Sequence, residues 1–212
     1  MASHPILIYL FIALSSVAVL KFLANMEENK DEIKFSEPGL EFLVFSLSAL
    51  VALLHTTFQP KWLAILCCIY MVICAETDYK EHVVYRICHY PVILASAIIL
   101  YLNYGVNIKI PFVFIILLIA AHVLKAYKSG DTWMFGALGL FLMSQGFDDL
   151  YLLSFWLISI VFFMISNITK IRYAPLDDNP DKKVLRFTKA QPIGPSICLA
   201  FMFIVFNGGF HF

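Results

Sequence analysis

The chain has 212 residues, of which 61% are hydrophobic and 14% are charged, and fifteen Lys and Arg residues balance fifteen Asp and Glu residues. A mean hydropathy of +0.82 is typical of an integral membrane protein and leaves no room for a soluble domain of useful size. The expected fold is therefore an all-α polytopic bundle.

Apolar windows predict about eight transmembrane helices, two or three of them short. Several windows approach the ~20 residues that span a hydrocarbon core ~30 Å thick. In chain order they cover residues 5–24, 39–58, 61–76, 90–104, 110–127, 132–147, 150–168 and 192–209.

The basic residues predict the orientation of these helices, because Lys and Arg collect on cytosolic loops. With the N-terminus outside, thirteen of the fifteen fall on one side and only Lys61 and Lys109 on the other. This split predicts that both termini are extracytoplasmic. The cytosolic loops are then residues 25–38, 77–89, 128–131 and 169–191.

The cysteines predict neither disulfides nor a metal centre. Cys67, Cys68, Cys74 and Cys198 fall inside predicted helices, Cys88 falls on a cytosolic loop, and no C-x-x-C pair occurs. No metal, cofactor or nucleic-acid partner is expected.

Two aspartates are predicted at the same depth and on the same face of the membrane. Asp78 closes the third predicted helix and Asp131 opens the sixth, both at their cytosolic ends. An Asp at a helix start is a favoured cap, which gives Asp131 a structural interpretation, whereas the helix dipole disfavours Asp78 at a helix end. Glu76 lies two residues before Asp78 and points away from it on a helix. Two converging carboxylates that share a proton would form an aspartyl hydrolase site.

Three segments resemble the signature motifs of type IV prepilin peptidases, in the right order and all on the predicted cytosolic face. "TDYKEHVVYRICHYP" is similar to the first, an aspartate at a helix end with a basic residue two positions on and a proline that starts the next helix: Asp78, Lys80 and Pro91. "SGDTWMFGALGLFL" is similar to the Gly-x-Gly-Asp segment, with Gly130 and Asp131. "AQPIGPSICLAF" is similar to the Pro-Phe-Gly-Pro run that opens the last helix.

The resemblance assigns a function and a set of site residues. It implies a multi-pass aspartyl endopeptidase of the bacterial inner membrane that cleaves the short, positively charged leader from a prepilin or pseudopilin, and so acts indirectly with the pilus or type II secretion machinery. The implied catalytic residues are Asp78 and Asp131. The implied supporting residues are Gly130, Lys80, Pro192, Gly194 and Pro195.

The resemblance also divides the chain. Residues 1–60 would form two N-terminal transmembrane helices with an acidic cytosolic loop, and residues 61–212 the catalytic bundle. Lys128 and Trp133 depart from the Gly-x-Gly-Asp pattern, where the family has glycine and lysine. Because the chain lacks the cytosolic insert with two C-x-x-C pairs that many members carry, N-methyltransferase activity is not expected.

The loop at residues 169–191 combines six basic residues, which should hold it against anionic membrane lipid, with an acidic turn. Asp177, Asp178 and Asp181 in this turn are candidates for docking the basic leader, although the same residues would also simply solvate a loop.

Two other functions remain open. One is an intramembrane protease of the presenilin or preflagellin-peptidase type. The other is a secretion or transport subunit without catalytic activity, in which carboxylates couple ions, normally near mid-membrane.

Overall fold

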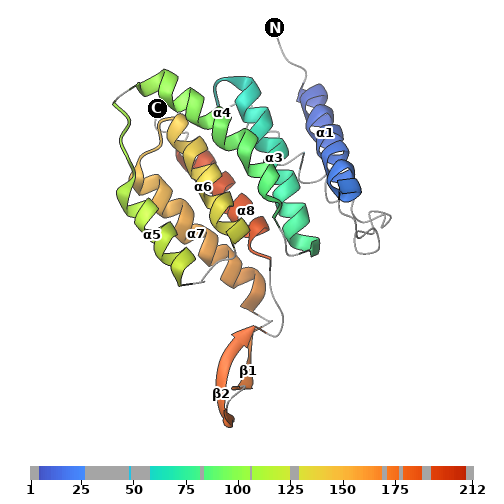
Figure 1. Ribbon diagram of the computed structural model, residues 1–212, viewed down its shortest axis with the longest axis vertical. Helices are drawn as coiled ribbons and strands as arrows, with labels where there is room; N and C mark the ends of the chain where they lie inside the picture. Colours follow the sequence, from blue (N-terminus) through green and yellow to red (C-terminus); the bar gives the residue numbers. More distant parts are fainter. Residues whose placement is uncertain are drawn as a thin grey trace.

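The structure is a computed structural model that describes residues 5–26, 48, 58–81, 84–105, 107–124, 129–168, 171–176, 179–187 and 192–208. Within these ranges it is a helical bundle with one small hairpin (Figure 1). The helices are α1 (Pro5–Met26), α3 (Lys61–Glu81), α4 (Arg86–Tyr104), α5 (Phe112–Val123), α6 (Ser129–Ser144), α7 (Asp149–Asn167) and α8 (Gly194–Gly208).

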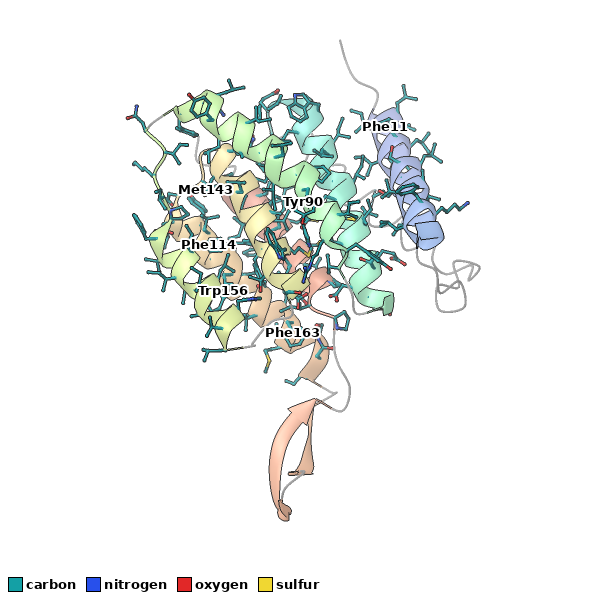
Figure 2. All side chains as sticks on the ribbon, in the orientation of Figure 1. Phe11, Tyr90, Phe114, Met143, Trp156 and Phe163 are labelled. Carbon is teal, nitrogen blue, oxygen red and sulfur yellow. The ribbon has the colours of Figure 1, made fainter. Side chains whose placement is uncertain are left out.

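Four of these helices are long and apolar enough to cross a membrane, which agrees with a helical membrane protein. They are α1, α3, α4 and α7, and α5 and α8 are shorter apolar helices. In α3, 72% of the candidate span is buried, against 28% in α1 and α4 and 17% in α7. Helix α3 is therefore the interior helix, and the others turn apolar surface outward, as Phe11 of α1 does (Figure 2).

Successive helices run in alternating directions, which brings distant segments to the same end of the bundle. Helix α3 contacts α1, α4, α6 and α8, and α6 also contacts α4, α5, α7 and α8. In Figure 1 the end of α3 and the starts of α4, α6 and α8 lie at the lower end of the bundle, on the side of the hairpin. The described parts of two predicted cytosolic segments, residues 77–81 and 84–89 and residues 129–131, thus lie at one end, where α8 begins.

Aromatic rings fill the core between α6, α7 and α8. The rings of Phe141 and Phe201 lie 5.7 Å apart, those of Phe155 and Phe201 6.0 Å, and those of Phe135 and Phe155 5.4 Å. All four side chains are fully buried. In a membrane such packing holds helices together, because lipid is as apolar as the side chains and supplies no hydrophobic driving force.

The loop predicted at residues 169–191 contains regular structure. Strands β1 (Ile171–Leu176) and β2 (Asn179–Phe187) form an antiparallel hairpin in which Ile171 pairs with Phe187 and Leu176 with Asn179. The expectation of an all-α chain missed this hairpin. Strand pairing satisfies the backbone N–H and C=O groups of a segment too polar to pack in the bundle. In Figure 1 the hairpin extends away from the helix ends.

Two predicted helix boundaries were wrong. Pro91 was expected to start a helix, but α4 begins five residues earlier at Arg86 and contains Pro91. The ring removes one intrahelical hydrogen bond, which the second turn of a helix tolerates as a local bend. The third predicted helix continues beyond residue 76 to Glu81, so that Asp78 lies inside α3. The predicted helix at 39–58 lies outside the described residues, apart from Ser48 and Phe58.

We predict that Gly139→Ala lowers the thermal unfolding midpoint of the detergent-solubilised protein. A Cβ at Gly139 would lie 2.8 Å from Cε1 of Phe114, whose ring packs from α5 onto α6 (Figure 2). Overpacking of this kind costs about 1–3 kcal/mol. Gly136→Ala in the same helix is the matched control, since a Cβ there meets nothing within 4 Å. It should leave the midpoint unchanged or raise it, and equal effects of the two substitutions would contradict the prediction.

Candidate active site

Asp78 is buried at the hairpin end of α3, with 3% of its surface exposed. Its Oδ2 atom accepts a hydrogen bond of 2.6 Å from the backbone N–H of Gly194, the first residue of α8. The two residues are 116 positions apart in the chain. The first and third sequence motifs therefore meet in space.

Helix geometry explains why a carboxylate is stable in this position. The C-terminal end of α3 disfavours a negative charge, but the first N–H groups of α8 have no intrahelical acceptor and carry the positive end of that helix dipole. Asp78 supplies the acceptor from a neighbouring helix, as an N-cap residue would from its own. The unfavourable dipole of α3 is offset by the favourable dipole of α8.

Gly194 fits this contact because it has no side chain. A Cβ at this position would lie 3.0 Å from Oδ2 and 3.1 Å from Cβ of Asp78. Pro195 occupies the second position of α8, where a missing N–H is tolerated. Pro192 precedes the helix and is partly buried. These residues of the third motif thus shape the start of α8 around Asp78.

Asp131 lies in the first turn of α6 and is also buried, with 6% of its surface exposed. The preceding residue, Gly130, packs on Val84, in the segment that connects α3 to α4. A Cβ at Gly130 would lie 3.0 Å from the Val84 Cβ and 3.2 Å from its carbonyl oxygen. Glycine allows α6 to start this close to the end of α3. The two aspartates thus lie on contacting helices at the same end of the bundle.

A histidine that the sequence analysis overlooked braces the helices beside the aspartates. His89 of α4 is 1% exposed, and its Nδ1 lies 2.7 Å from the hydroxyl of Tyr70 on α3. Its ring stacks on Trp133 of α6 at a centroid distance of 6.3 Å. One side chain thereby connects α3, α4 and α6. Nothing in the spacing of the sequence pairs these three residues.

Two more of the predicted site residues lie in regular secondary structure. Lys80 lies in the last turn of α3, and Asp181 lies in β2. Asp177 and Asp178 lie outside the described residues. Glu76 is buried in α3 with 1% of its surface exposed. Together with Asp78 and Asp131, it is a third buried carboxyl group at this end of the bundle.

Asp148, at the other end of the bundle, has a structural role. Asp148 is the N-cap of α7, where its Oδ1 accepts hydrogen bonds from the N–H groups of Leu150 and Tyr151 at 3.0 and 3.2 Å. Asp148 thereby satisfies two of the free donors at the start of α7.

The described residues contain no group of three or more His, Cys, Asp or Glu side chains placed to hold a metal ion. Carboxyl groups, a backbone N–H and an imidazole lie at this end of the described bundle.

Comparisons with protein-family models, with curated proteins and with solved structures found no match to this chain. The fold and the buried aspartates define its class as a helical membrane protein with carboxyl groups at one end of the bundle.

We predict that Asp78→Leu destabilises the protein more than Asp78→Asn. Leucine leaves the buried N–H of Gly194 without its acceptor, which costs about 1–3 kcal/mol, whereas the amide oxygen of asparagine can replace the carboxylate oxygen. Thermal unfolding of both variants and amide hydrogen exchange at Gly194 measure the difference. Equal midpoints and equal exchange rates would show that the hydrogen bond does not hold α8 in place.

Proposed function

We propose that this protein is a membrane-embedded aspartyl endopeptidase of the prepilin peptidase type, with Asp78 and Asp131 as its catalytic residues. Its substrate is a type IV pilin-like precursor, a prepilin or a pseudopilin, and the bond cut joins the short basic leader to the apolar N-terminal helix. The proposal includes eight membrane spans with both termini extracytoplasmic, in the inner membrane of a bacterium.

The observation that carries the proposal is the hydrogen bond between Gly194 and Asp78. Three motifs were assigned to one site from their resemblance alone, and two of them are in direct contact in the folded chain. The close approach of Gly130 to Val84 brings the remaining motif to the same end of the bundle. A role in capping α8 would account for Asp78 alone, whereas a catalytic pair accounts for both Asp78 and the buried Asp131 of the contacting helix α6.

The chemistry follows from two carboxyl groups that share one proton. The ionised carboxylate takes a proton from a water molecule as its oxygen attacks the scissile carbonyl carbon. The protonated partner donates to the carbonyl oxygen and stabilises the tetrahedral intermediate, which collapses when the leaving nitrogen is protonated. The pair titrates as a unit, so neither aspartate has a separate role before substrate binds.

The position of the aspartates also suits the substrate. A basic leader stays on the side that carries most of the Lys and Arg residues, and the scissile bond reaches the membrane boundary where the substrate helix begins. Asp78 lies three residues before the end of α3, and Asp131 is the third residue of α6. Carboxylates that couple ions in transporters normally lie near mid-membrane instead.

We predict that Asp78→Asn and Asp131→Asn each abolish processing of a co-expressed prepilin, while the protein stays folded. Each substitution removes one carboxyl group without changing side-chain size. Because the two residues act as a unit, the double variant should be no worse than either single variant. Mass spectrometry of the pilin N-terminus measures the outcome.

Two control variants accompany this test. Asp149→Asn changes an aspartate in the first turn of a helix at the opposite end of the bundle, and Glu76→Gln changes the buried carboxyl group next to the site. Both should process the precursor at the parental rate. If either catalytic variant also did so, the role assigned to that aspartate would be wrong.

We also propose that the acidic residues Asp177, Asp178 and Asp181 attract the leader. Changing Asp177, Asp178 and Asp181 together to Lys should raise the Michaelis constant for a precursor with a basic leader. The effect should shrink at high salt, because salt screens attraction and repulsion between exposed charges. A precursor with a neutral leader is the control. A parental ratio of the two cleavage rates at every ionic strength would exclude the docking role.

A further inference from the structure

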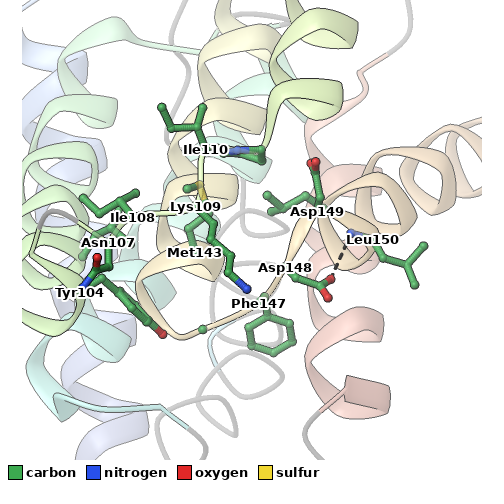
Figure 3. Close-up of a pocket in the computed structure, with 14 residues that line it drawn as sticks. Tyr104, Asn107, Ile108, Lys109, Ile110, Met143, Phe147, Asp148, Asp149 and Leu150 are labelled. Atoms are coloured by element: carbon green, nitrogen blue, oxygen red, sulfur yellow. Dashed lines mark hydrogen bonds between the residues drawn. The ribbon is translucent and has the colours of Figure 1, made fainter.

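A cavity of about 610 Å³ lies at the end of the bundle opposite the aspartates. Its volume falls within the range of ligand sites, roughly 300–1,000 Å³. The wall comes from the end of α4, the extended segment before α5, the end of α6 and the start of α7 (Figure 3). The proposed catalytic residues contribute nothing to it.

The cavity contains one cation and one available carboxylate. Lys109 lines it and forms no ion pair with any described residue. Asp148 is engaged as the cap of α7, but the adjacent Asp149 has a buried Oδ1 atom without a hydrogen-bond partner among the described groups. In Figure 3 Lys109 extends toward the turn at Phe147, whereas the carboxylate of Asp149 points in another direction. The charged groups of Lys109 and Asp149 therefore point in different directions.

Lys109 is exposed where it lines the cavity, so an anionic group can reach its ammonium. It is one of only two basic residues on the side of the chain that the distribution of Lys and Arg otherwise leaves empty. A buried carboxylate oxygen without a donor likewise costs free energy unless a ligand or water supplies one. A ligand with an anionic group for Lys109 and an N–H donor for Asp149 satisfies both.

The surroundings indicate a lipid. The candidate membrane spans of α4 and α7 end at Tyr104 and begin at Asp149, so the cavity lies at the level where hydrocarbon meets headgroups. Leu100, Met143 and Leu152 give it an apolar side. The Tyr104 side chain lies over Gly146, where a Cβ would come within 2.9 Å of the hydroxyl and where φ is +90°. A tyrosine at this level is typical of the membrane interface.

We propose that this cavity binds the headgroup of a phospholipid that carries a phosphate and a primary ammonium, as in phosphatidylethanolamine. The phosphate accepts from the Lys109 ammonium, and the lipid ammonium donates to Asp149. A choline headgroup has no N–H to donate, and a glycerol headgroup brings no cation to the carboxylate. The inference is independent of the proposed peptidase activity.

The first test measures lipid affinity of the unaltered protein in detergent micelles by native mass spectrometry. The lipids share identical acyl chains and are phosphatidylethanolamine, its N-methyl and N,N-dimethyl derivatives, phosphatidylcholine and phosphatidylglycerol. Affinity should be highest for phosphatidylethanolamine and about tenfold lower for phosphatidylcholine, because a hydrogen bond to a charged group is lost. Equal affinity across the methylation series, or a preference for phosphatidylglycerol, would overturn the proposal.

Variants then locate the site. Asp149→Asn should bind phosphatidylethanolamine and phosphatidylcholine equally, whereas Lys109→Gln should bind both weakly and Lys109→Arg should restore binding. Lys61→Gln is the matched control, because Lys61 is the other basic residue of this side and does not line the cavity. If Lys61→Gln and Lys109→Gln had the same effect, the lipid would be bound by general charge and the site assignment would be wrong. Should a variant fail to fold, the methylation series decides alone.

Discussion

The hydrogen bond between the Gly194 N–H and the Asp78 carboxylate is the contact on which this end of the bundle depends. Asp78 is buried there, which makes the hydrogen bond stronger than it would be in water, and the bond joins the end of α3 to the start of α8. A negative charge that would be unfavourable at the end of α3 becomes favourable beside the start of α8. Glycine suits that start because a Cβ there would lie 3.0 Å from Oδ2 and 3.1 Å from Cβ of Asp78, closer than most Cβ contacts.

Close packing in the same region holds the helix that carries Asp131. Gly130 lets α6 begin against the backbone of Val84, and Trp133 stacks on His89, which is itself bonded to Tyr70 of α3. Two aspartates in a hydrolytic pair must hold their separation within fractions of an ångström. Here the helices that bear them are connected both directly and through α4. At the opposite end of the bundle, α7 is capped by Asp148, the residue directly before it in the chain. A cavity lies beside this cap.

The sequence predicted a helical membrane protein, because that class follows from helix length and composition. It also placed Asp78 and Asp131 at helix ends on one face of the membrane, and in the structure both lie at the same end of the bundle. It did not predict that Gly194 would touch Asp78, since helix windows show where segments begin and end but not which helices are neighbours. His89 was missed for the same reason, because its partners lie on two other helices. Pro91 was misplaced because proline disfavours a helix interior only locally, and α4 has enough other hydrogen bonds to accommodate it. The hairpin was missed because strand pairing in a short polar loop leaves little trace in hydropathy.

The apolar stretch that contains α5 runs only from residue 110 to residue 124, between Lys109 and Lys125. Even if it were helical throughout, it would rise about 22 Å, less than the ~30 Å of a hydrocarbon core. Phe112, Ile116 and Ile119 nevertheless turn their side chains outward on this helix. As a membrane span, a helix of this length would require the lipid beside it to thin, at a cost of fractions of a kcal/mol per ångström of mismatch. The bilayer surface would then be indented next to the start of α6, and water would come closer to Asp131 than the length of the neighbouring helices suggests.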